Sequence, residues 1–579
     1  MSGSATDGPA FPTLEQMQQW TSVLGRAQQL LLEQAAGATG RTLPFDPDAV
    51  ARIQTGFADE GLALWRRFLD SGGLLRDQPD APPAGSPAAR KDRRFADPAW
   101  NQHPFYDLIR QSYLLISDYL LGLADAVDGV DPRQKEKIRF ATGNMLDAMA
   151  PSNFPLTNPT VVARTIETGG ENLVAGLKHM LADLEKGQLT HTDGTAFELG
   201  RNIAATPGKV IKETPLYQLI HYAPTTKSAL ETPLLIFPPW INRFYILDLS
   251  PEKSFVKWAV DQGLSVFLVS WKSADESMKD LIWDDYIDRA MIDAIDTVRA
   301  LLDVPAVHTI GYCVAGTTLA ATLALLAARG EGEKVKSATF FTAQVDFSEA
   351  GDLSLFVDDE QMALVERLSA RGFLDGRYMA ATFNLLRGRD LIWNYVVNNY
   401  LLGQDYPPFD LLYWNGDTTN LPARWHKEYL TRLYRDNRLA TPGGVSVAGV
   451  PIDLSRITTP AYVQAGREDH IAPLASVWKL NDHLAGPVRF LLAGSGHIAG
   501  VINPPASGKY QYWTCAERQP TLDQFIAHAV ETKGSWWPDW IEWIRALDGR
   551  TVPVKGARRP GRGALKAIED APGRYVRTR

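Results

Sequence analysis

The chain has 579 residues, of which 45% are hydrophobic and 22% are charged, proportions typical of a globular protein that is long enough for more than one domain. Its formal net charge of −8 argues against nucleic acid as a partner, because nucleic-acid binding needs a basic surface. The sequence contains only two cysteines, no apolar run of the roughly 18 residues that a transmembrane helix needs, and no basic residue before Arg26 that could begin a signal peptide. We therefore expect a cytoplasmic protein without a transmembrane segment or a disulfide framework.

Residues 1–200 are predicted to form a mostly helical N-terminal domain. Residues 1–12 have the composition of a disordered start, and the prolines and glycine between 77 and 90 indicate a linker. Apolar residues at helical spacing predict helices over 14–33, 105–127, 134–149 and 169–186. Asn158 followed by Pro159 is typical of the start of a further helix.

The pattern changes in residues 201–579, where short apolar runs alternate with amphipathic helices. This alternation is typical of an α/β domain with a parallel sheet covered by helices. The runs predict strands at 233–237, 266–270, 307–310, 338–343, 460–465 and 488–493. An aromatic-rich insert from about 346 to 456 separates the fourth strand from the fifth, and we expect it to form a cap over the active site.

Two features follow the last predicted strand. A tryptophan cluster between Trp536 and Trp543 indicates core packing or an anchor, and the basic stretch 555–562 is predicted to be a surface arm.

The segment Gly311-Tyr312-Cys313-Val314-Ala315-Gly316 lies between the predicted strand 307–310 and a helix of small residues that ends at Gly330. A strand, a Gly-x-nucleophile-x-small turn and a helix form the nucleophile elbow of α/β-hydrolase folds. The turn is crowded, so the positions around the nucleophile must be small. The sequence therefore predicts an α/β-hydrolase fold with Cys313 as its nucleophile.

In this fold an acid and a histidine follow the nucleophile in chain order. Asp469 lies on the turn after the predicted strand 460–465, and His497 lies in a glycine-rich loop after the strand 488–493. Both positions are at the carboxyl ends of parallel strands, where α/β active sites form. We therefore predict a catalytic triad of Cys313, Asp469 and His497.

Each of the three triad residues, considered alone, could have a purely structural role instead of a catalytic one. A free cysteine can be a small buried hydrophobic residue, Asp469 can be a turn residue, and most histidines are structural. His470 and His308 are interpreted in that way. No pair of histidines or cysteines has the spacing of metal ligands, so neither a metal nor a cofactor is expected.

The predicted oxyanion hole uses two backbone N–H groups. One belongs to Val314, the residue after the nucleophile. The other must come from the loop after strand 233–237, where two prolines lack an N–H, which leaves Trp240, Ile241 or Asn242; we choose Ile241. A cysteine nucleophile suits an acyltransferase that loads from a thioester, because an acyl-cysteine is itself a thioester and the later transfer to a hydroxyl runs downhill.

These residues resemble the polyhydroxyalkanoate synthases, most closely the class I enzymes that act without a partner subunit. The resemblance covers nearly the whole chain and rests on these segments: Asp92-Arg93-Arg94-Phe95, Pro151-Ser152-Asn153, Pro238-Pro239-Trp240-Ile241-Asn242, Gly311-Tyr312-Cys313-Val314-Ala315-Gly316, Gly466-Arg467-Glu468-Asp469-His470, Gly496-His497-Ile498-Ala499-Gly500 and Ser535-Trp536-Trp537-Pro538. Ala315 replaces the glycine that is usual in the family box, a change that we expect to tune activity.

The resemblance implies polymerisation of (R)-3-hydroxyacyl-CoA, chiefly (R)-3-hydroxybutyryl-CoA, into polyhydroxyalkanoate polyester with release of CoA. Cys313 would carry the acyl chain, and His497 would activate the thiol and the incoming hydroxyl. Asp469 would either orient His497 or assist the hydroxyl. The family likeness also implies a homodimer, a location on polyester granules, and contacts of the N-terminal domain with the granule and with granule-associated proteins. Arg387 and Arg389 in the insert could meet CoA phosphates or face solvent.

Two other functions remain open at this stage. A Cys-dependent hydrolase or thioesterase would use the same triad, but it must admit water, whereas the aromatic insert favours a covered site. A catalytically silent granule-binding protein would have no need for Cys313, Asp469 and His497 together.

Overall fold

The structure is a computed structural model that describes residues 45–70 and 92–578. The predicted disordered start 1–12, helix 14–33 and linker 77–90 lie outside the described residues. Contacts divide the described chain into two compact units. The helical unit comprises the described residues up to Leu189 and the segment Arg387–Asp405, and the sheet unit comprises Thr190–Leu386 and the residues from Tyr406 onward.

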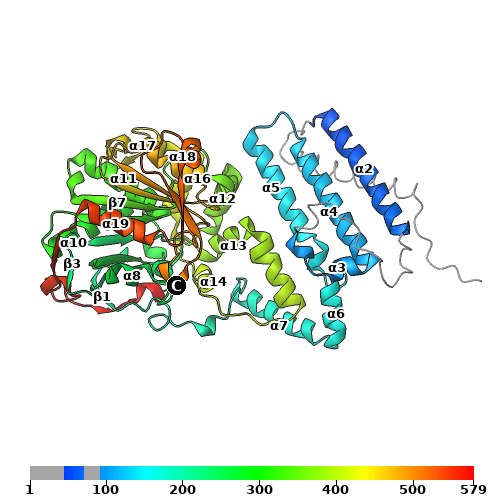
Figure 1. Cartoon of the computed structure of the whole chain (residues 1–579), viewed down its shortest axis with the longest axis horizontal. Helices are drawn as coiled ribbons and strands as arrows, with labels where there is room; N and C mark the ends of the chain where they lie inside the picture. Colours follow the sequence, from blue (N-terminus) through cyan, green and yellow to red (C-terminus); the bar gives the residue numbers. More distant parts are fainter. Residues whose placement is uncertain (1–44, 71–91, 579) are drawn as a thin grey trace, which may run out of the picture. The chain divides into compact units, whose positions relative to one another are not determined.

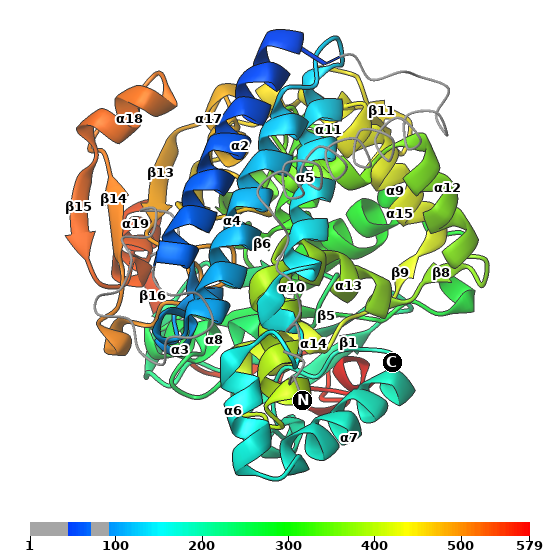
Figure 2. The same ribbon diagram turned by 90° about the vertical axis from the view of Figure 1, so that its right-hand side faces the viewer.

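The helical unit contains the helices that the apolar spacing predicted between residues 105 and 186. Helix α4 packs between α2 and α5 (Figure 2), and α6 starts at Pro159 with the side chain of Asn158 as its N-cap. The main helices are α2 (Pro47–Asp70), α4 (Pro104–Asp125), α5 (Pro132–Ala148), α6 (Pro159–Glu167) and α7 (Glu171–Lys186).

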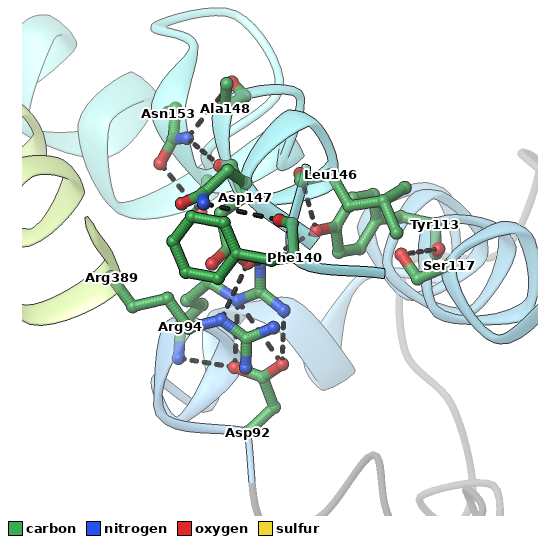
Figure 3. A network of polar contacts seen from close by, with 12 residues as sticks. Asp92, Arg94, Tyr113, Ser117, Phe140, Leu146, Asp147, Ala148, Asn153 and Arg389 are labelled. Atoms are coloured by element: carbon green, nitrogen blue, oxygen red, sulfur yellow. Dashed lines mark hydrogen bonds and ion pairs between the residues drawn. The ribbon is translucent and has the colours of Figure 1, made fainter. Parts of the chain in front are cut away.

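A network of polar and charged side chains joins residues 92–94 to helices α4 and α5 and to Arg389, all within the helical unit (Figure 3). Arg94 donates hydrogen bonds to Asp92 Oδ2 at 2.7 Å, to Asp147 Oδ1 at 3.0 Å and to the hydroxyl of Tyr113 at 2.7 Å. Arg389 reaches the same Asp147 Oδ1 at 2.6 Å. Asp147 therefore accepts hydrogen bonds from arginines of two segments that are far apart in the sequence, which ties part of the insert to the helical unit.

Helix α7 contacts the end of the 387–405 segment, around Tyr400 and Leu401. Asn172 donates to the carbonyl oxygen of Leu401 at 2.7 Å, and the hydroxyl of Tyr400 donates to Asp183 at 2.7 Å. Between these contacts the backbone of Tyr400 lies so close to Gly176 that a Cβ there would be 1.7 Å from the Tyr400 oxygen. The 387–405 segment of the insert thus packs directly on a glycine of α7.

The sheet unit is built on an 11-stranded mixed sheet in the order β15-β14-β13-β12-β7-β6-β4-β5-β2-β1-β17. All six predicted strands are present, and they pair in parallel from β5 to β13. Their bounds are β4 Leu234–Phe237, β5 Val266–Trp271, β6 Val307–Tyr312, β7 Val335–Phe341, β12 Ala461–Gly466 and β13 Val488–Ala493.

Antiparallel strands extend the sheet on both sides. They are β1 (Gly208–Glu213), β2 (Tyr217–Tyr222), β14 (Gln511–Thr514), β15 (Val530–Lys533) and β17 (Glu569–Asp570). The α/β-hydrolase fold with a preceding helical region is therefore confirmed, while the sheet is mixed and wider than the sequence predicted.

Two large apolar clusters bury the two faces of the sheet. Helices α10 (Asp293–Leu302) and α11 (Val314–Arg329) contribute to one cluster, and α8 (Phe255–Asp261) and α19 (Trp537–Leu547) contribute to the other (Figure 1). Trp536, Trp537 and Trp540 are almost completely buried, so the core-packing interpretation of the tryptophan cluster is confirmed.

The basic stretch 555–562 is predicted to be a surface arm, and Lys555, Arg559 and Arg562 are indeed exposed, but one residue of the stretch is not. Arg558 is buried, and its guanidinium donates to the carbonyl oxygens of Leu230 at 3.1 Å and Glu231 at 2.6 Å. These carbonyl groups lie at the end of the short strand β3 (Ser228–Leu230) and just beyond it, so the arginine fixes this stretch against the sheet unit.

No helix among the described residues combines the length and the hydrophobicity that crossing a bilayer requires.

Candidate active site

Cys313 occupies a strained turn between β6 and α11. Its backbone has φ 53° and ψ −124°, a region that residues other than glycine rarely adopt. The N–H of Cys313 donates to the carbonyl oxygen of Phe341 at 2.9 Å, and the carbonyl oxygen of Cys313 accepts from the N–H of Gly316 at 2.8 Å. The backbone of the strained residue is therefore held on both sides, as expected for a nucleophile elbow.

Two glycines allow the strand and the helix to meet at this turn. A Cβ on Gly311 would lie 2.7 Å from the Cα of Gly316, and a Cβ on Gly316 would lie 2.4 Å from the Cβ of Ala343 and 2.8 Å from the carbonyl oxygen of Gly311. Ala315 is fully buried in the first turn of α11, so its methyl group fits where the family box usually has glycine.

Replacing Gly316 with Ala is expected to lower the free energy of unfolding by about 1–3 kcal/mol, the usual cost of overpacking a dense core. The midpoint of urea unfolding measures this change. Gly332→Ala is the matched control, because the nearest atom to its added Cβ is 3.9 Å away. Equal midpoints for the two variants would contradict the close approach of β6 and α11.

The structure brings Asp469 and His497 into direct contact. His497 Nδ1 lies 2.7 Å from Asp469 Oδ2, and both side chains are buried. Asp469 Oδ1 accepts hydrogen bonds from the backbone N–H groups of Ile471 at 2.8 Å and Ala472 at 2.9 Å. The carboxylate therefore has one oxygen fixed by the backbone and the other directed at the imidazole.

The electrostatic environment of His497 favours its protonated form. Burial alone would lower the pKa of the imidazole, but the negative charge of Asp469, together with the nearby Cys313 sulfur, outweighs burial and raises the pKa from 6.5 to about 10. The contribution of Cys313 to this rise in pKa means that its sulfur lies within electrostatic range of the imidazole. His308 behaves differently: its Nδ1 is 2.8 Å from Ser337 Oγ, and burial lowers its pKa to about 4.

Three aromatic residues that the sequence did not assign to the site fix the loop of His497. The hydroxyl of Tyr312 donates to the carbonyl oxygen of His497 at 2.8 Å. The indole N–H groups of Trp536 and Trp537 donate to the carbonyl oxygens of Gly500 at 2.7 Å and Val501 at 2.9 Å. The sequence offered one signal for these contacts: all three residues lie in the motif segments on which the family resemblance rests. A buried tyrosine or tryptophan also needs a hydrogen-bond partner for its polar atom.

Cys313 opens onto a cavity of about 320 Å³ within the sheet unit. Val314 and Ile241, the residues predicted to form the oxyanion hole, also line this cavity. The neighbours of Ile241 face elsewhere: Trp240 is buried and stacks on Tyr286 at 4.5 Å between ring centroids, and Asn242 donates to the carbonyl oxygen of Asn415 at 3.2 Å. Of the three alternatives, Ile241 lines the cavity of the nucleophile, and the role of its backbone N–H stays a prediction.

Residues of the insert form most of the remaining cavity wall. They come mainly from α12 (Asp359–Leu368), α13 (Gly376–Leu386) and α15 (Ala423–Tyr429), and most of their cavity-lining side chains are apolar. The insert thus gives the cavity of the nucleophile a mainly apolar wall, and polar transition states respond strongly to nearby dipoles in such surroundings.

Other candidate groups lie outside this arrangement. Cys515 follows β14, where its sulfur lies 3.8 Å from the carbonyl oxygen of Phe525 and burial raises the pKa of its thiol. Arg387 pairs with Asp390 at 2.6 Å, and Arg389 pairs with Asp147. In residues 45–70 and 92–578 no group of three or more His, Cys, Asp or Glu side chains is arranged to hold a metal ion.

Comparison with known proteins places this site in a family. Residues 91–259 match the model described as "Poly-beta-hydroxybutyrate polymerase (PhaC) N-terminus", and residues 229–504 match the alpha/beta hydrolase fold. "Poly(3-hydroxyalkanoate) polymerase subunit PhaC" of Rhizobium meliloti is 46% identical over 539 residues, which cover 92% of this chain and 86% of the relative. The chain belongs to the poly(3-hydroxyalkanoate) polymerase family.

Two further polymerases have similar coverage. The protein of Cupriavidus necator named "Poly(3-hydroxyalkanoate) polymerase subunit PhaC" is 42% identical over 584 residues, 99% of this chain and 96% of the relative. "Poly(3-hydroxyalkanoate) polymerase" of Methylorubrum extorquens is 43% identical over 540 residues, 92% of this chain and 87% of the relative. The predicted membership of the polyhydroxyalkanoate synthases, which are acyltransferases, is confirmed.

Proposed function

We propose that this polymerase converts (R)-3-hydroxyacyl-CoA, chiefly (R)-3-hydroxybutyryl-CoA, into polyhydroxyalkanoate polyester with release of CoA, through an acyl thioester on Cys313. The observation that carries the proposal is a cysteine on a strained elbow that lines a mainly apolar cavity, together with a buried histidine–carboxylate pair. Membership of the poly(3-hydroxyalkanoate) polymerase family supports a polyester as the product of this acyl transfer.

In the first half of the reaction His497, whose surroundings favour the protonated form, holds the proton of the Cys313 thiol, and the resulting thiolate attacks the thioester carbonyl carbon of the substrate. The backbone N–H groups of Val314 and Ile241 stabilise the tetrahedral oxyanion. The carbon–sulfur bond to CoA then breaks, and His497 returns the proton to the departing CoA sulfur. The acyl group is left on Cys313 as a thioester, so this step costs little free energy.

In the second half a 3-hydroxyl group attacks the acyl-cysteine. His497 removes the hydroxyl proton, the ester bond forms, and the Cys313 sulfur leaves and regains a proton. The contact between His497 Nδ1 and Asp469 keeps the other ring nitrogen available to the reacting groups. Because water would compete with the hydroxyl, the apolar wall of the insert favours polymer over free acid.

The proposal includes a cytoplasmic homodimer that works at the granule surface. An exposed apolar stripe on α7 supports the granule contact, since Val174, Leu177, Leu181 and Leu184 follow one another at helical spacing and are 49–69% exposed. Exposed apolar patches of this kind mark binding surfaces, and a polyester surface is apolar enough to bury them.

Replacing Leu177 and Leu181 together with Glu is expected to reduce the fraction of enzyme that sediments with polyester granules at least about three-fold, because charged side chains resist burial against an apolar surface. CoA release should stay within two-fold of the unaltered enzyme, roughly as for other surface changes. Lys178→Glu is a matched control for the added charge on the same helix. Unchanged sedimentation of the double variant would exclude this stripe as the granule contact.

Incubation with (R)-3-hydroxybutyryl-CoA tests the proposed function, with thiol release followed by a chromogenic disulfide and the product followed by solvent extraction. Thiol release with an insoluble polyester is the expected result. Thiol release with only free hydroxy acid would make the protein a hydrolase, and no thiol release would make it a silent granule-binding protein; either result would overturn the proposal.

A further inference from the structure

The peptide group between Trp240 and Ile241 carries the second N–H of the predicted oxyanion hole. Ile241 lines the cavity of Cys313, and its N–H donates a hydrogen bond to no described residue. In a planar trans peptide the C=O and the N–H point in opposite directions. A group that holds the Trp240 carbonyl oxygen therefore also sets the direction of the Ile241 N–H.

One residue of the insert, Thr419, holds the carbonyl groups on both sides of this N–H. Its hydroxyl donates to the carbonyl oxygen of Trp240, and its backbone N–H donates to the carbonyl oxygen of Ile241 at 3.2 Å. Thr419 is 2% exposed, so water does not compete with these bonds. The direction of the Ile241 N–H thus depends on a threonine more than 170 residues later in the chain.

Thr419 is itself held in place on both sides. The residue after it, Asn420, exchanges hydrogen bonds of 3.1 and 3.2 Å with Ala274, just beyond β5. Two residues before it, Asp417 accepts from the hydroxyl of Tyr245 at 2.8 Å. Burial, together with the charge of Asp417, raises the pKa of Tyr245 well above 10, so this hydroxyl keeps its proton and remains a donor.

A buried ion pair adjoins these contacts. Arg243 Nε lies 3.5 Å from Asp417 Oδ1, and the two side chains are 1% and 4% exposed. Arg243 also donates to the carbonyl oxygens of Tyr575 at 3.2 Å and Thr578 at 2.7 Å. The loop after β4 is therefore fixed to the insert and to the end of the chain, and an oxyanion donor needs such a preorganised backbone.

We propose that Thr419 is a positioning residue whose hydroxyl orients the Trp240–Ile241 peptide, so that the Ile241 N–H points at the oxyanion formed on the carbon that Cys313 attacks. The inference rests on the proposed function, because it takes acyl transfer at Cys313 through a tetrahedral oxyanion. Thr419 does not line the cavity, and it acts only through this peptide. The insert then supports half of the oxyanion hole in addition to forming the cavity wall.

The test compares two reactions of Cys313, only one of which forms an oxyanion. With p-nitrophenyl (R)-3-hydroxybutyrate, the thiolate attacks the ester carbonyl carbon, and the bond to the nitrophenyl oxygen breaks to release p-nitrophenolate. With iodoacetamide, the thiolate displaces iodide without an oxyanion. The full chain carries Cys515→Ala throughout, so that Cys313 is its only thiol. Nitrophenolate release in the first turnover measures acylation, and loss of free thiol measures alkylation.

Thr419→Val removes the hydroxyl and keeps the branched shape and the backbone N–H. Acylation is expected to slow about 10- to 100-fold, because full loss of an oxyanion donor costs on the order of 10²- to 10³-fold and one bond from Thr419 remains. Alkylation should stay within about two-fold, since it makes no use of the oxyanion hole. Equal slowing of both reactions, or of neither, would overturn the proposal.

Three further variants separate orientation from folding. Thr419→Ala also lacks the hydroxyl and should give the same ratio of acylation to alkylation as Thr419→Val, whereas Thr419→Ser keeps the hydroxyl and should restore the ratio to within about three-fold. Thr309→Val is the matched control, because the Thr309 hydroxyl donates to another buried carbonyl oxygen, that of Ser337, at 3.1 Å. A loss with Thr419→Ser or Thr309→Val as large as that with Thr419→Val would contradict the role of this hydroxyl.

Steady-state CoA release distinguishes this inference from the proposed function. Thr419→Val should lower kcat with KM nearly unchanged, because the lost interaction is made only in the transition state. If the unaltered chain is acylated but forms no polymer, the proposed function fails while the ratio still tests Thr419. If it forms polymer and Thr419→Val leaves the ratio unchanged, the inference about Thr419 alone is wrong.

Discussion

Replacing Cys313 with Ala is expected to abolish CoA release from (R)-3-hydroxybutyryl-CoA, with a loss on the order of 10⁶-fold or below detection, as when the nucleophile of a comparable triad is removed. The fold should persist, because Ala is also small and the surrounding backbone is held by the hydrogen bonds to Phe341 and Gly316. Thiol release measures the activity, and circular dichroism with a melting curve measures the fold.

Cys515→Ala is the matched control for this experiment. Its sulfur contacts the carbonyl oxygen of Phe525 and has no part in the proposed chemistry, so most activity should remain. A loss as large as that of Cys313→Ala, or substantial polymer formation by Cys313→Ala, would contradict the assignment of the nucleophile.

Replacing Asp469 with Asn is expected to lower kcat/KM about 10²- to 10⁴-fold, as in comparable triads. The Asn oxygen can still accept from the N–H groups of Ile471 and Ala472, which turns its NH₂ group toward His497 Nδ1. Nδ1 must then accept, so the ring proton moves to Nε2 and that atom can no longer take a proton from the thiol. Steady-state thiol release measures the effect.

The same substitution has a predictable dependence on pH. Without the carboxylate, the pKa of His497 falls from about 10 toward its ordinary value. A raised pKa in the folded state stabilises the fold fully below the unfolded value of about 6.5, and this contribution disappears as the pH rises through about 10. The unfolding free energies of the enzyme and of Asp469→Asn should therefore converge between these two pH values.

Glu468→Gln is the control, because it removes a carboxylate from the same turn without touching the pair. Glu468 is exposed, and Asp469 makes the contact to His497. It should leave both kcat/KM and the pH dependence of stability nearly unchanged. If the two variants lose activity equally, a general effect on the turn is responsible, and the specific role of Asp469 is wrong.

Features with a local pattern could be predicted from the sequence. The elbow at Cys313 requires small neighbours on both sides, and each parallel strand is a short apolar run because both of its faces are buried. Strand β2 was missed because Gln218 and His221 interrupt its apolar pattern, although both side chains are completely buried in the structure. Strand β14 was missed because its sequence, Gln-Tyr-Trp-Thr, begins and ends with polar residues and contains no apolar aliphatic run.

Contacts between distant segments could not be predicted. The basic stretch around Arg558 appears solvent-exposed in the sequence, but two backbone carbonyl groups more than 300 residues away accept its hydrogen bonds. The partners of Trp536 and Trp537 are likewise in the loop after His497, 36 residues earlier. Hydrophobic spacing indicates that a tryptophan is buried, but it does not show which carbonyl group its N–H will reach.

These two indole contacts affect the order in which the enzyme becomes competent during its own synthesis. Cys313, Asp469 and His497 all leave the ribosome before Trp536 and Trp537, the N-cap and first residue of α19, whose indole N–H groups hold the loop of the histidine. A nascent chain can therefore contain every reacting group while its base is still loosely positioned. Catalysis would then begin only after Trp536 and Trp537 have been synthesised and have bound the loop of the histidine.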